Sequence, residues 1–161
     1  MAQASSTEPL KIDGSAAHLQ MYDRDFIQWV DHAAELLKQG RFDELDLENL
    51  IDEVECLGRS EKHALTSNLR ILLMHLLKWQ YQIEKRTGSW RGTVAEHRTR
   101  IQEAFEHSPS LKTYYVQVFD KSYGKARILA ASETGLDLKL FPVECLYSVD
   151  QVLDDEFWPG T

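Results

Sequence analysis

Hydrophobic residues recur at steps of three and four positions along most of the chain, which is the period of an amphipathic α-helix. The first such series lies between Tyr22 and Gly40 and consists of Phe26, Trp29, Val30, Ala33, Leu36 and Leu37. The second series precedes Gly58 and consists of Leu47, Leu50, Ile51, Val54 and Leu57. Because glycine is common just past the end of a helix, Gly40 and Gly58 predict where these two helices stop.

The third series is the most regular one, and it follows Ser60, a good N-cap residue. Its apolar positions are Leu65, Leu69, Leu72, Leu76, Trp79 and Ile83. Alternating steps of four and three give a seam that packs against near-parallel or antiparallel neighbours. At 100° per residue, Glu61, Asn68 and His75 fall along one flank of this seam. The histidine inside "ILLMHLLKW" is therefore predicted at the edge of the core.

The remaining periodic segments predict two more long helices and a short one. One opens at Ser89 and ends before "SPS", and the next runs from Pro109 to Gly135. Ser148 and Gln151 have the spacing of a capping box for a last helix that reaches Trp158. No segment alternates with period two. The predicted fold class is therefore all-α, a helical bundle of about five main helices plus a short C-terminal helix, with no sheet.

The periodic pattern begins near residue 21, and it sets the predicted domain organisation. Residues 1–20, "MAQASSTEPLKIDGSAAHLQ", are polar and aperiodic and are predicted to form a flexible leader. Residues 21–161 are predicted to form a single helical domain, because 161 residues suffice for one ordinary core.

Charge is unevenly distributed along a chain whose formal net charge is −8. Residues 41–61 contain eight acidic residues against Arg41 and Arg59, whereas residues 62–100 contain eight Lys or Arg against Glu84 and Glu96. No apolar run approaches the roughly 18 residues that cross a bilayer, so no membrane partner is expected. The two cysteines have no metal or redox spacing and no signal peptide opens the chain, which favours a cytoplasmic protein.

Two histidines are the first candidates for chemistry. If the third and fourth helices form an antiparallel hairpin about "EKRTGS", His75 comes level with His97, and Glu48, Asp52 and Glu55 could add carboxylates. Motifs of the HExxH, paired ExxH and CxxC kinds are absent, and so are a nucleophile elbow and a phosphate loop. We therefore expect neutral imidazoles at the core edge, assign no metal ligand or cofactor, and identify no catalytic residue.

Basic residues gather at the tip of the same hairpin, beside an aromatic ring. They are Lys85, Arg86, Arg91, Arg98 and Arg100, next to Trp90. Free backbone amides at the start of the fourth helix would favour an anion there. Together with His75 and His97 these are the candidate binding residues. The cluster can be a solvated or internally paired face, a protein-partner surface, or a nucleic-acid or phosphate site, and the acidic total disfavours the last.

Ordered blocks across the chain carry a resemblance to a known family. The blocks are "YDRDFIQWV", "LDLENLIDEVECLGRSEKHAL", "LLMHLLKWQYQ", "SWRGTVAEHR", "SPSL", "ASETGLDL" and "FPVECLYSVDQVLDDEFWP". In this order they resemble the bacterial family catalogued as domain of unknown function family 29, over about residues 21–160. The resemblance implies an all-helical fold and no established activity. His97 stands where the resemblance implies Gln.

The leading functional hypothesis is a non-enzymatic protein-interaction or regulatory module of the bacterial cytoplasm. One alternative is a metal-dependent or other enzyme that uses a cluster of histidines and carboxylates in the bundle. Another is a nucleic-acid-associated protein that works through the hairpin tip. The pattern makes no prediction of the oligomeric state.

Overall fold

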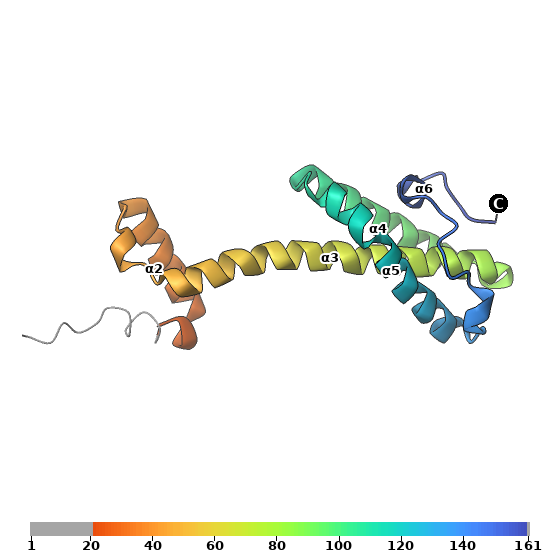
Figure 1. Cartoon of the computed structure of the whole chain (residues 1–161), viewed down its shortest axis with the longest axis horizontal. Helices are drawn as coiled ribbons and strands as arrows, with labels where there is room; N and C mark the ends of the chain where they lie inside the picture. Colours follow the sequence, from red (N-terminus) through yellow and green to blue (C-terminus); the bar gives the residue numbers. More distant parts are fainter. Residues whose placement is uncertain (1–20, 161) are drawn as a thin grey trace, which may run out of the picture. The chain divides into compact units, whose positions relative to one another are not determined.

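The computed structural model describes residues 21–160, and within them every regular element is helical (Figure 1). After a helical turn at residues 21–24 come α2 (Phe26–Gln39), η1 (Phe42–Glu44), α3 (Leu47–Tyr81), η2 (Ile83–Lys85), α4 (Gly88–His107), α5 (Leu111–Thr134), η3 (Leu138–Leu140) and α6 (Val149–Leu153). The predicted all-α fold without a sheet is confirmed for this part of the chain. The predicted leader, residues 1–20, lies outside the described residues.

The described chain divides into two compact units, residues 21–57 and residues 58–160. The boundary falls inside α3, after Leu57. The first unit therefore contains α2, η1 and the first turns of α3. The second contains the remainder of α3 and everything that follows it.

The first unit is a helical hairpin whose ends are set by local capping. Asp25 caps α2 by accepting a hydrogen bond from the backbone N–H of Gln28 at 3.0 Å. Gly40 ends α2 with a φ of 70°, a left-handed conformation that glycine adopts without steric cost. The predicted stop at Gly40 is therefore confirmed. Asp46 opens α3 by accepting from the backbone N–H of Asn49 at 3.4 Å and from its side-chain amide at 2.7 Å.

Trp29 is the centre of the first unit and is only 3% exposed. Its indole N–H donates to Asp46 Oδ2 at 3.2 Å, which joins α2 to the start of α3. The Tyr22 ring meets the Trp29 ring edge-on at 5.0 Å, and its hydroxyl donates to Glu53 Oε1 at 2.6 Å. These two side-chain hydrogen bonds fix the pairing of the two helices.

Gly58 does not end a helix, so the prediction of two helices separated at this glycine is wrong. The helix α3 runs without interruption for 35 residues, through Gly58 and Ser60. Gly58 does not have the positive φ that a helix-ending glycine adopts, in contrast to Gly40. Strong helix formers such as Glu55, Leu57 and Glu61 flank it, and a single glycine costs only about 1 kcal/mol in a helix interior.

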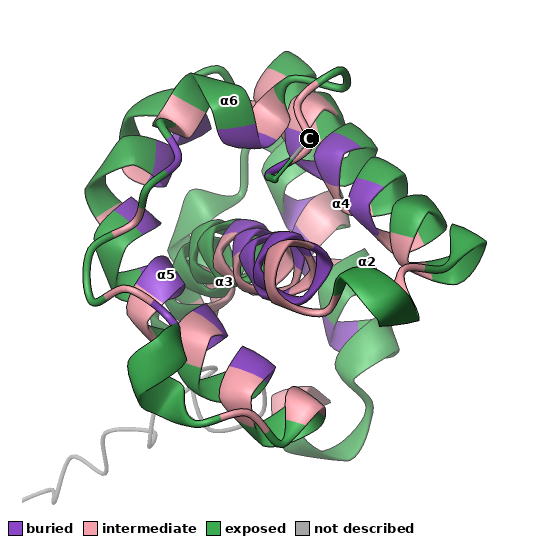
Figure 2. Cartoon of the chain, turned by 90° about the vertical axis from the view of Figure 1, so that its right-hand side faces the viewer, coloured by how far each residue is buried: buried purple, intermediate pink, exposed green. Residues whose placement is uncertain are grey.

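The last turns of α3 form the middle of the second unit, and they are buried on nearly all sides. In Figure 2, which looks along this helix, α4 and α5 lie on either side of it and α6 lies above. Six of the eight residues from Leu72 to Trp79 are buried and apolar: Leu72, Leu73, Met74, Leu76, Leu77 and Trp79. A helix that is apolar all round must be covered all round. The predicted seam is confirmed, except that Ile83 lies beyond the end of α3 and is 64% exposed.

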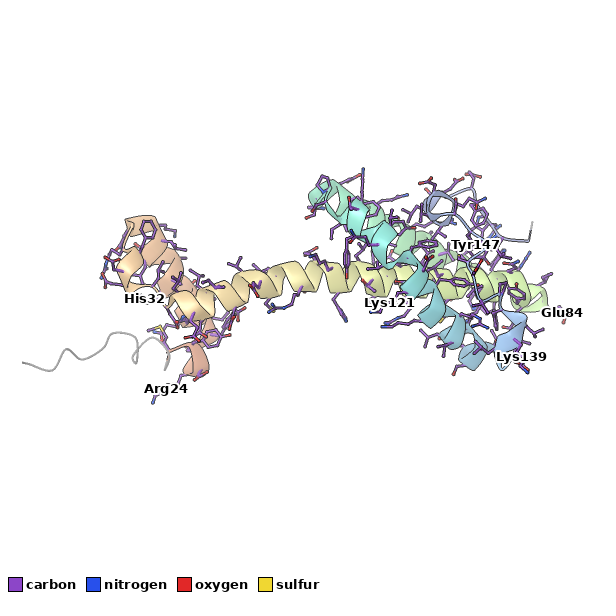
Figure 3. The ribbon with its side chains drawn as sticks, viewed as in Figure 1. Arg24, His32, Glu84, Lys121, Lys139 and Tyr147 are labelled. Atoms are coloured by element: carbon purple, nitrogen blue, oxygen red, sulfur yellow. The ribbon has the colours of Figure 1, made fainter. Side chains whose placement is uncertain are left out.

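The chain after α5 packs against this core although it has little regular structure. Its backbone carbonyls therefore need side-chain donors, since unpaired buried carbonyls are costly. The Tyr123 hydroxyl donates to Pro142 O at 2.9 Å, and Arg127 Nε donates to Phe141 O at 2.8 Å. In the opposite direction the Tyr147 hydroxyl, labelled in Figure 3, donates to Gln80 of α3.

The short helix α6 begins as predicted and ends earlier than predicted. The Ser148 hydroxyl accepts from Gln151 N at 3.1 Å, and Gln151 Oε1 accepts from Ser148 N at 2.9 Å. The predicted capping box is thus confirmed. The helix stops at Leu153 instead of reaching Trp158, and the chain then turns so that the carbonyls of Asp155 and Phe157 face Arg98.

Arg98 is the largest fully buried side chain, with 1% of its surface exposed. Its guanidinium donates three hydrogen bonds to backbone carbonyls: Nε to Val152 at 2.9 Å, Nη1 to Asp155 at 3.2 Å and Nη2 to Phe157 at 2.7 Å. Burial lowers the pKa of this group, and the carboxylate of Asp155 opposes that effect. One charged side chain from α4 thus holds both α6 and the chain that follows it.

We expect Arg98→Met to lower the free energy of unfolding by about 3 kcal/mol or more, because buried carbonyls lose their donors. Arg100→Met is the matched control. Arg100 is exposed and pairs with Glu96 at 2.8 Å, so its replacement should cost less than about 0.5 kcal/mol. Urea unfolding followed by circular dichroism measures both, and equal losses would contradict the anchoring role.

Gly58→Ala should stabilise the protein by about 0.5–1 kcal/mol, because alanine lowers the entropy of the unfolded chain and favours the helix. A methyl group at this position meets no atom within 4 Å. Gly40→Ala has equal space but requires a positive φ, so it should destabilise by about 1 kcal/mol. Thermal unfolding of the two variants checks that their stability changes have opposite signs. A Gly58→Ala variant less stable than the wild type would contradict the continuous helix.

A polar and basic hairpin tip, two histidines and an apolar groove

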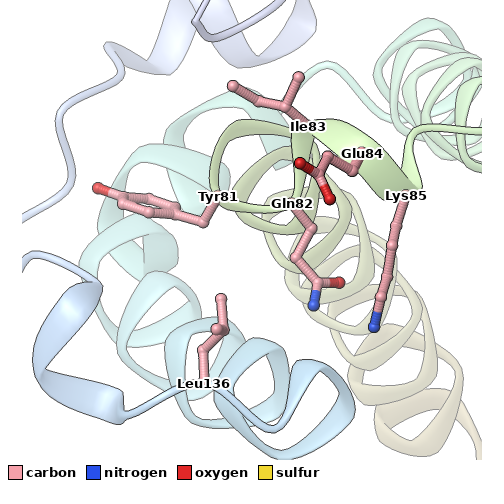
Figure 4. A pocket seen from close by; sticks show the side chains of 6 residues that line it. All are labelled: Tyr81, Gln82, Ile83, Glu84, Lys85 and Leu136. Atoms are coloured by element: carbon pink, nitrogen blue, oxygen red, sulfur yellow. The ribbon is translucent and has the colours of Figure 1, made fainter.

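The turn between α3 and α4, where the basic tip is predicted, carries a shallow pocket of about 370 Å³ (Figure 4). Its lining residues are Tyr81, Gln82, Ile83, Glu84, Lys85 and Leu136. The Gln82 side-chain amide donates to Thr134 O at 3.3 Å and so ties the turn to the end of α5. Glu84 and Lys85 are both exposed, and their side chains point in different directions. One anionic and one cationic side chain therefore line the pocket.

Two arginines of the predicted tip lie on tryptophan rings. Arg86 Nε donates to Trp79 O at 2.9 Å, and its guanidinium lies 4.8 Å from the centre of the Trp79 ring. Arg91 lies 5.4 Å from the Trp79 ring and 5.3 Å from the Trp158 ring. Cation–π contacts of this kind stabilise a folded chain. These guanidiniums hold the end of the described chain against α3, and Arg86 Nη2 is buried without a described acceptor.

The other members of the predicted set are separated by their partners. Trp90 is partly buried under Lys78, whose ammonium lies 4.6 Å from the ring centre and pairs with Glu133 at 2.6 Å. Arg98 is buried, and Arg100 pairs with Glu96. Internal contacts thus engage most of the predicted cluster. Its binding role stays a prediction that depends on Lys85 and on Arg91, whose side chain remains exposed although it contacts the two rings.

Both candidate histidines are held as Nδ1–H tautomers by their neighbours. His75 Nδ1 lies 3.1 Å from Ile71 O, and a carbonyl only accepts, so this nitrogen carries the proton. His97 Nδ1 lies 2.7 Å from Asn68 Oδ1, which also accepts. Each Nε2 is left with a lone pair. His97 pairs with Asn68, two helical turns before His75, so the partner supplied by α3 is an amide and not the second imidazole.

Burial lowers the pKa of both histidines, and it is the largest cause in each case. Nearby cations act in the same direction, Lys78 on His75 and Arg100 on His97, and His75 lowers the pKa of His97 further. Neutral imidazoles are the metal-binding form. In the part of the chain that the structure describes, however, no three His, Cys, Asp or Glu side chains are grouped to hold a metal ion.

A groove of about 490 Å³ lies between α3 and α4 on the side of His97's partner Asn68. It is lined by Glu61, Ala64, Leu65, Asn68, Arg100, Glu103, Ala104, His107 and Ser108. Its charged groups are of both signs, and Arg100 is already paired with Glu96.

Burial raises the pKa of the Cys145 thiol to about 11. This thiol therefore stays protonated at neutral pH and is a poor nucleophile.

An apolar groove lies in the first unit, between α2 and the first turns of α3. Its volume is about 380 Å³, and it is lined by Phe26, Trp29, Val30, Ala33, Ala34, Leu37, Leu50, Glu53, Val54 and Leu57. Glu53 is the single ionisable group in this lining. Its carboxylate accepts the hydrogen bond from Tyr22, which raises the pKa of that hydroxyl to about 12. The hydroxyl therefore remains a donor at neutral pH.

Several apolar side chains that were expected in the core line this groove and are exposed: Phe26, Val30, Leu37, Val54 and Leu57. More than half of the exposed large apolar residues of the described chain fall in residues 21–57: Phe26, Ile27, Val30, Leu37, Phe42, Leu47, Ile51, Val54 and Leu57. The helical period predicted an apolar stripe correctly on both helices. The period did not indicate that part of this stripe is exposed. An apolar stripe has the same period whether it packs against its own chain or against another protein.

The lowered histidine pKa values predict that stability falls on acidification. In the unfolded chain an imidazole titrates near pH 6.5, and in the folded chain it titrates lower, so unfolding takes up protons between these values. Stability is complete above about pH 6.5 and is lost as the pH falls below it. His97→Gln keeps a donor for Asn68 and removes the titration. Its unfolding midpoint should depend less on pH between about 7 and 5 than that of the wild type.

His63→Gln, at an exposed position on α3, provides the control. It should leave the pH profile of the unfolding midpoint unchanged. Parallel profiles for the wild type and His97→Gln would contradict a neutral, partly buried His97.

The comparisons with known proteins give a family and no function. A family model described as "domain of unknown function DUF29" matches residues 21–158. Neither the curated proteins nor the solved structures compared with the chain gave a match. The matched span includes both units and all of the helices described above. The chain therefore belongs to the DUF29 family.

Proposed function

We propose that this protein is a non-enzymatic interaction module that binds a partner protein in the apolar groove between α2 and the first turns of α3. The single observation that carries the proposal is the uncovered apolar lining of that groove. Contiguous exposed apolar surface of this kind marks protein-interaction sites on soluble proteins. A cleft between two helices accepts the apolar face of a third helix, which is a recurrent mode of peptide recognition.

The polar candidate sites support an enzyme less well. The groove beside Asn68 contains side chains of both charge signs, but it has no hydroxyl or thiol paired with a base. The hairpin tip uses most of its cations in internal contacts with Trp79, Trp158 and Glu96. In the described chain, by contrast, the large apolar side chains that line the groove of the first unit remain exposed.

Substitution of Val54 by aspartate tests the proposal. Val54 is 61% exposed, so Val54→Asp should leave the fold intact, and a carboxylate in the groove would have to be desolvated by any apolar partner. Tagged full-length protein should retain specific partners in a quantitative capture experiment, and Val54→Asp should reduce their yield about tenfold.

Val116→Asp is the matched control, since Val116 is 57% exposed on α5 of the second unit. It should retain the partners that Val54→Asp loses. Retention of every specific partner by both variants would place binding outside the groove and overturn the proposal. Loss with Lys85→Ala or Arg91→Ala instead would transfer the interaction to the predicted hairpin tip.

A further inference from the structure

We infer that the occupant of the apolar groove is a basic amphipathic helix, one that carries an apolar stripe flanked by Lys and Arg. This inference rests on the proposed function, because it names the partner of the same groove. The shape and apolar lining of the site point to a helix with large apolar side chains on one face. The negative charge of the unit that forms the groove favours positively charged residues on the other face of that bound helix.

The net negative charge of the protein lies almost entirely in the first unit. Residues 21–57 include eleven Asp and Glu against three Lys and Arg, a formal net charge of −8, whereas residues 58–161 include thirteen against fourteen. The charge of the whole chain is also −8. A unit of 37 described residues with this charge produces a strongly negative potential over its surface. The groove is thus apolar within an acidic surrounding.

One carboxylate enters the apolar groove itself. Glu53 Oε1 accepts the hydrogen bond of the Tyr22 hydroxyl at 2.6 Å, which holds the carboxylate against the helical turn that precedes α2. No described hydrogen bond engages Oε2. A guanidinium or ammonium at the edge of a bound apolar stripe would pair with this oxygen. An acidic or neutral helix would instead leave the carboxylate partly desolvated and unpaired, which costs affinity.

The same charge disfavours a second copy of this chain as the occupant. A symmetric dimer through the groove would bring two units of formal charge −8 face to face and would join Glu53 to an equally acidic surface. Like charges across an interface oppose association. A basic helix satisfies the apolar and the electrostatic requirement together.

The test uses full-length protein and synthetic helical peptides with a neutral dye. The probe is a peptide of roughly 18 residues, five helical turns, with Leu at helical spacing and Lys elsewhere. A second peptide replaces every Lys by Glu, and a third has the composition of the first in scrambled order. Fluorescence anisotropy at about 0.15 M salt should show the Leu/Lys helix binding at least about tenfold more tightly than either comparison peptide, a margin well outside measurement error.

Val54→Asp separates the groove from general attraction between opposite charges. It adds a negative charge, so purely electrostatic association would become tighter, whereas groove binding should weaken by about tenfold. Val116→Asp adds the same charge outside the groove and should leave the affinity within about twofold. Glu53→Gln keeps an acceptor for Tyr22 and should weaken binding of the Lys peptide by about two- to threefold, because one charge pair is lost.

Several outcomes would overturn the inference, and they separate it from the proposed function. If the Leu/Glu peptide binds as tightly as the Leu/Lys peptide and Val54→Asp weakens both, the groove binds a helix but not a basic one. In that case the proposed function stands and this inference fails. If Val54→Asp has no effect on any peptide or captured partner, both fail. If sedimentation shows a dimer of the full chain that Val54→Asp dissociates, a second copy fills the groove and the inference fails.

Discussion

The second unit depends on the burial of one stretch of α3, from Leu72 to Trp79, on nearly every side. A helix with a single apolar stripe needs one neighbour, but a helix that is apolar all round needs neighbours on each side. The helices α4 and α5 supply two of them, and the weakly structured chain around α6 supplies another (Figure 2). The chain around α6 packs on the apolar core, so its backbone carbonyls require hydrogen-bond donors from side chains. Arg98, Tyr123 and Arg127 provide these donors.

The sequence was a good guide to which positions are apolar and a poorer guide to what covers them. The seam through Leu65, Leu69 and Leu76 was predicted and is buried, because its period is enforced by helix geometry. Val30 on α2 and Val54 on α3 belong to series with the same period, and both are exposed. The period of apolar residues shows only how side chains are distributed around one helix. It does not show whether another part of the protein packs against the apolar face, because that depends on the tertiary structure.

Two further predictions depended on residue type and met competing effects. Gly58 resembles a helix stop, but a glycine ends a helix only where the chain takes a left-handed turn, and here its helix-forming neighbours continue α3. The boundary between the two compact units nevertheless falls between Leu57 and Gly58. Arg98 was placed with the basic residues of the hairpin tip because of its position in the sequence, but its side chain is fully buried. Its three carbonyl acceptors lie 54 to 59 residues later, beyond the reach of any local pattern.

The separation in sequence between Arg98 and its acceptors also determines when the second unit can complete its folding during synthesis. When α3 and α4 have emerged from the ribosome, the Arg98 side chain is present and Val152, Asp155 and Phe157 are not. Burying an arginine without acceptors is strongly unfavourable, so the helices made first must leave this side chain in water. The core beneath it can close only after residues 152–157 arrive. A nascent second unit therefore keeps part of its apolar surface exposed until a late stage, when chaperones have access to it.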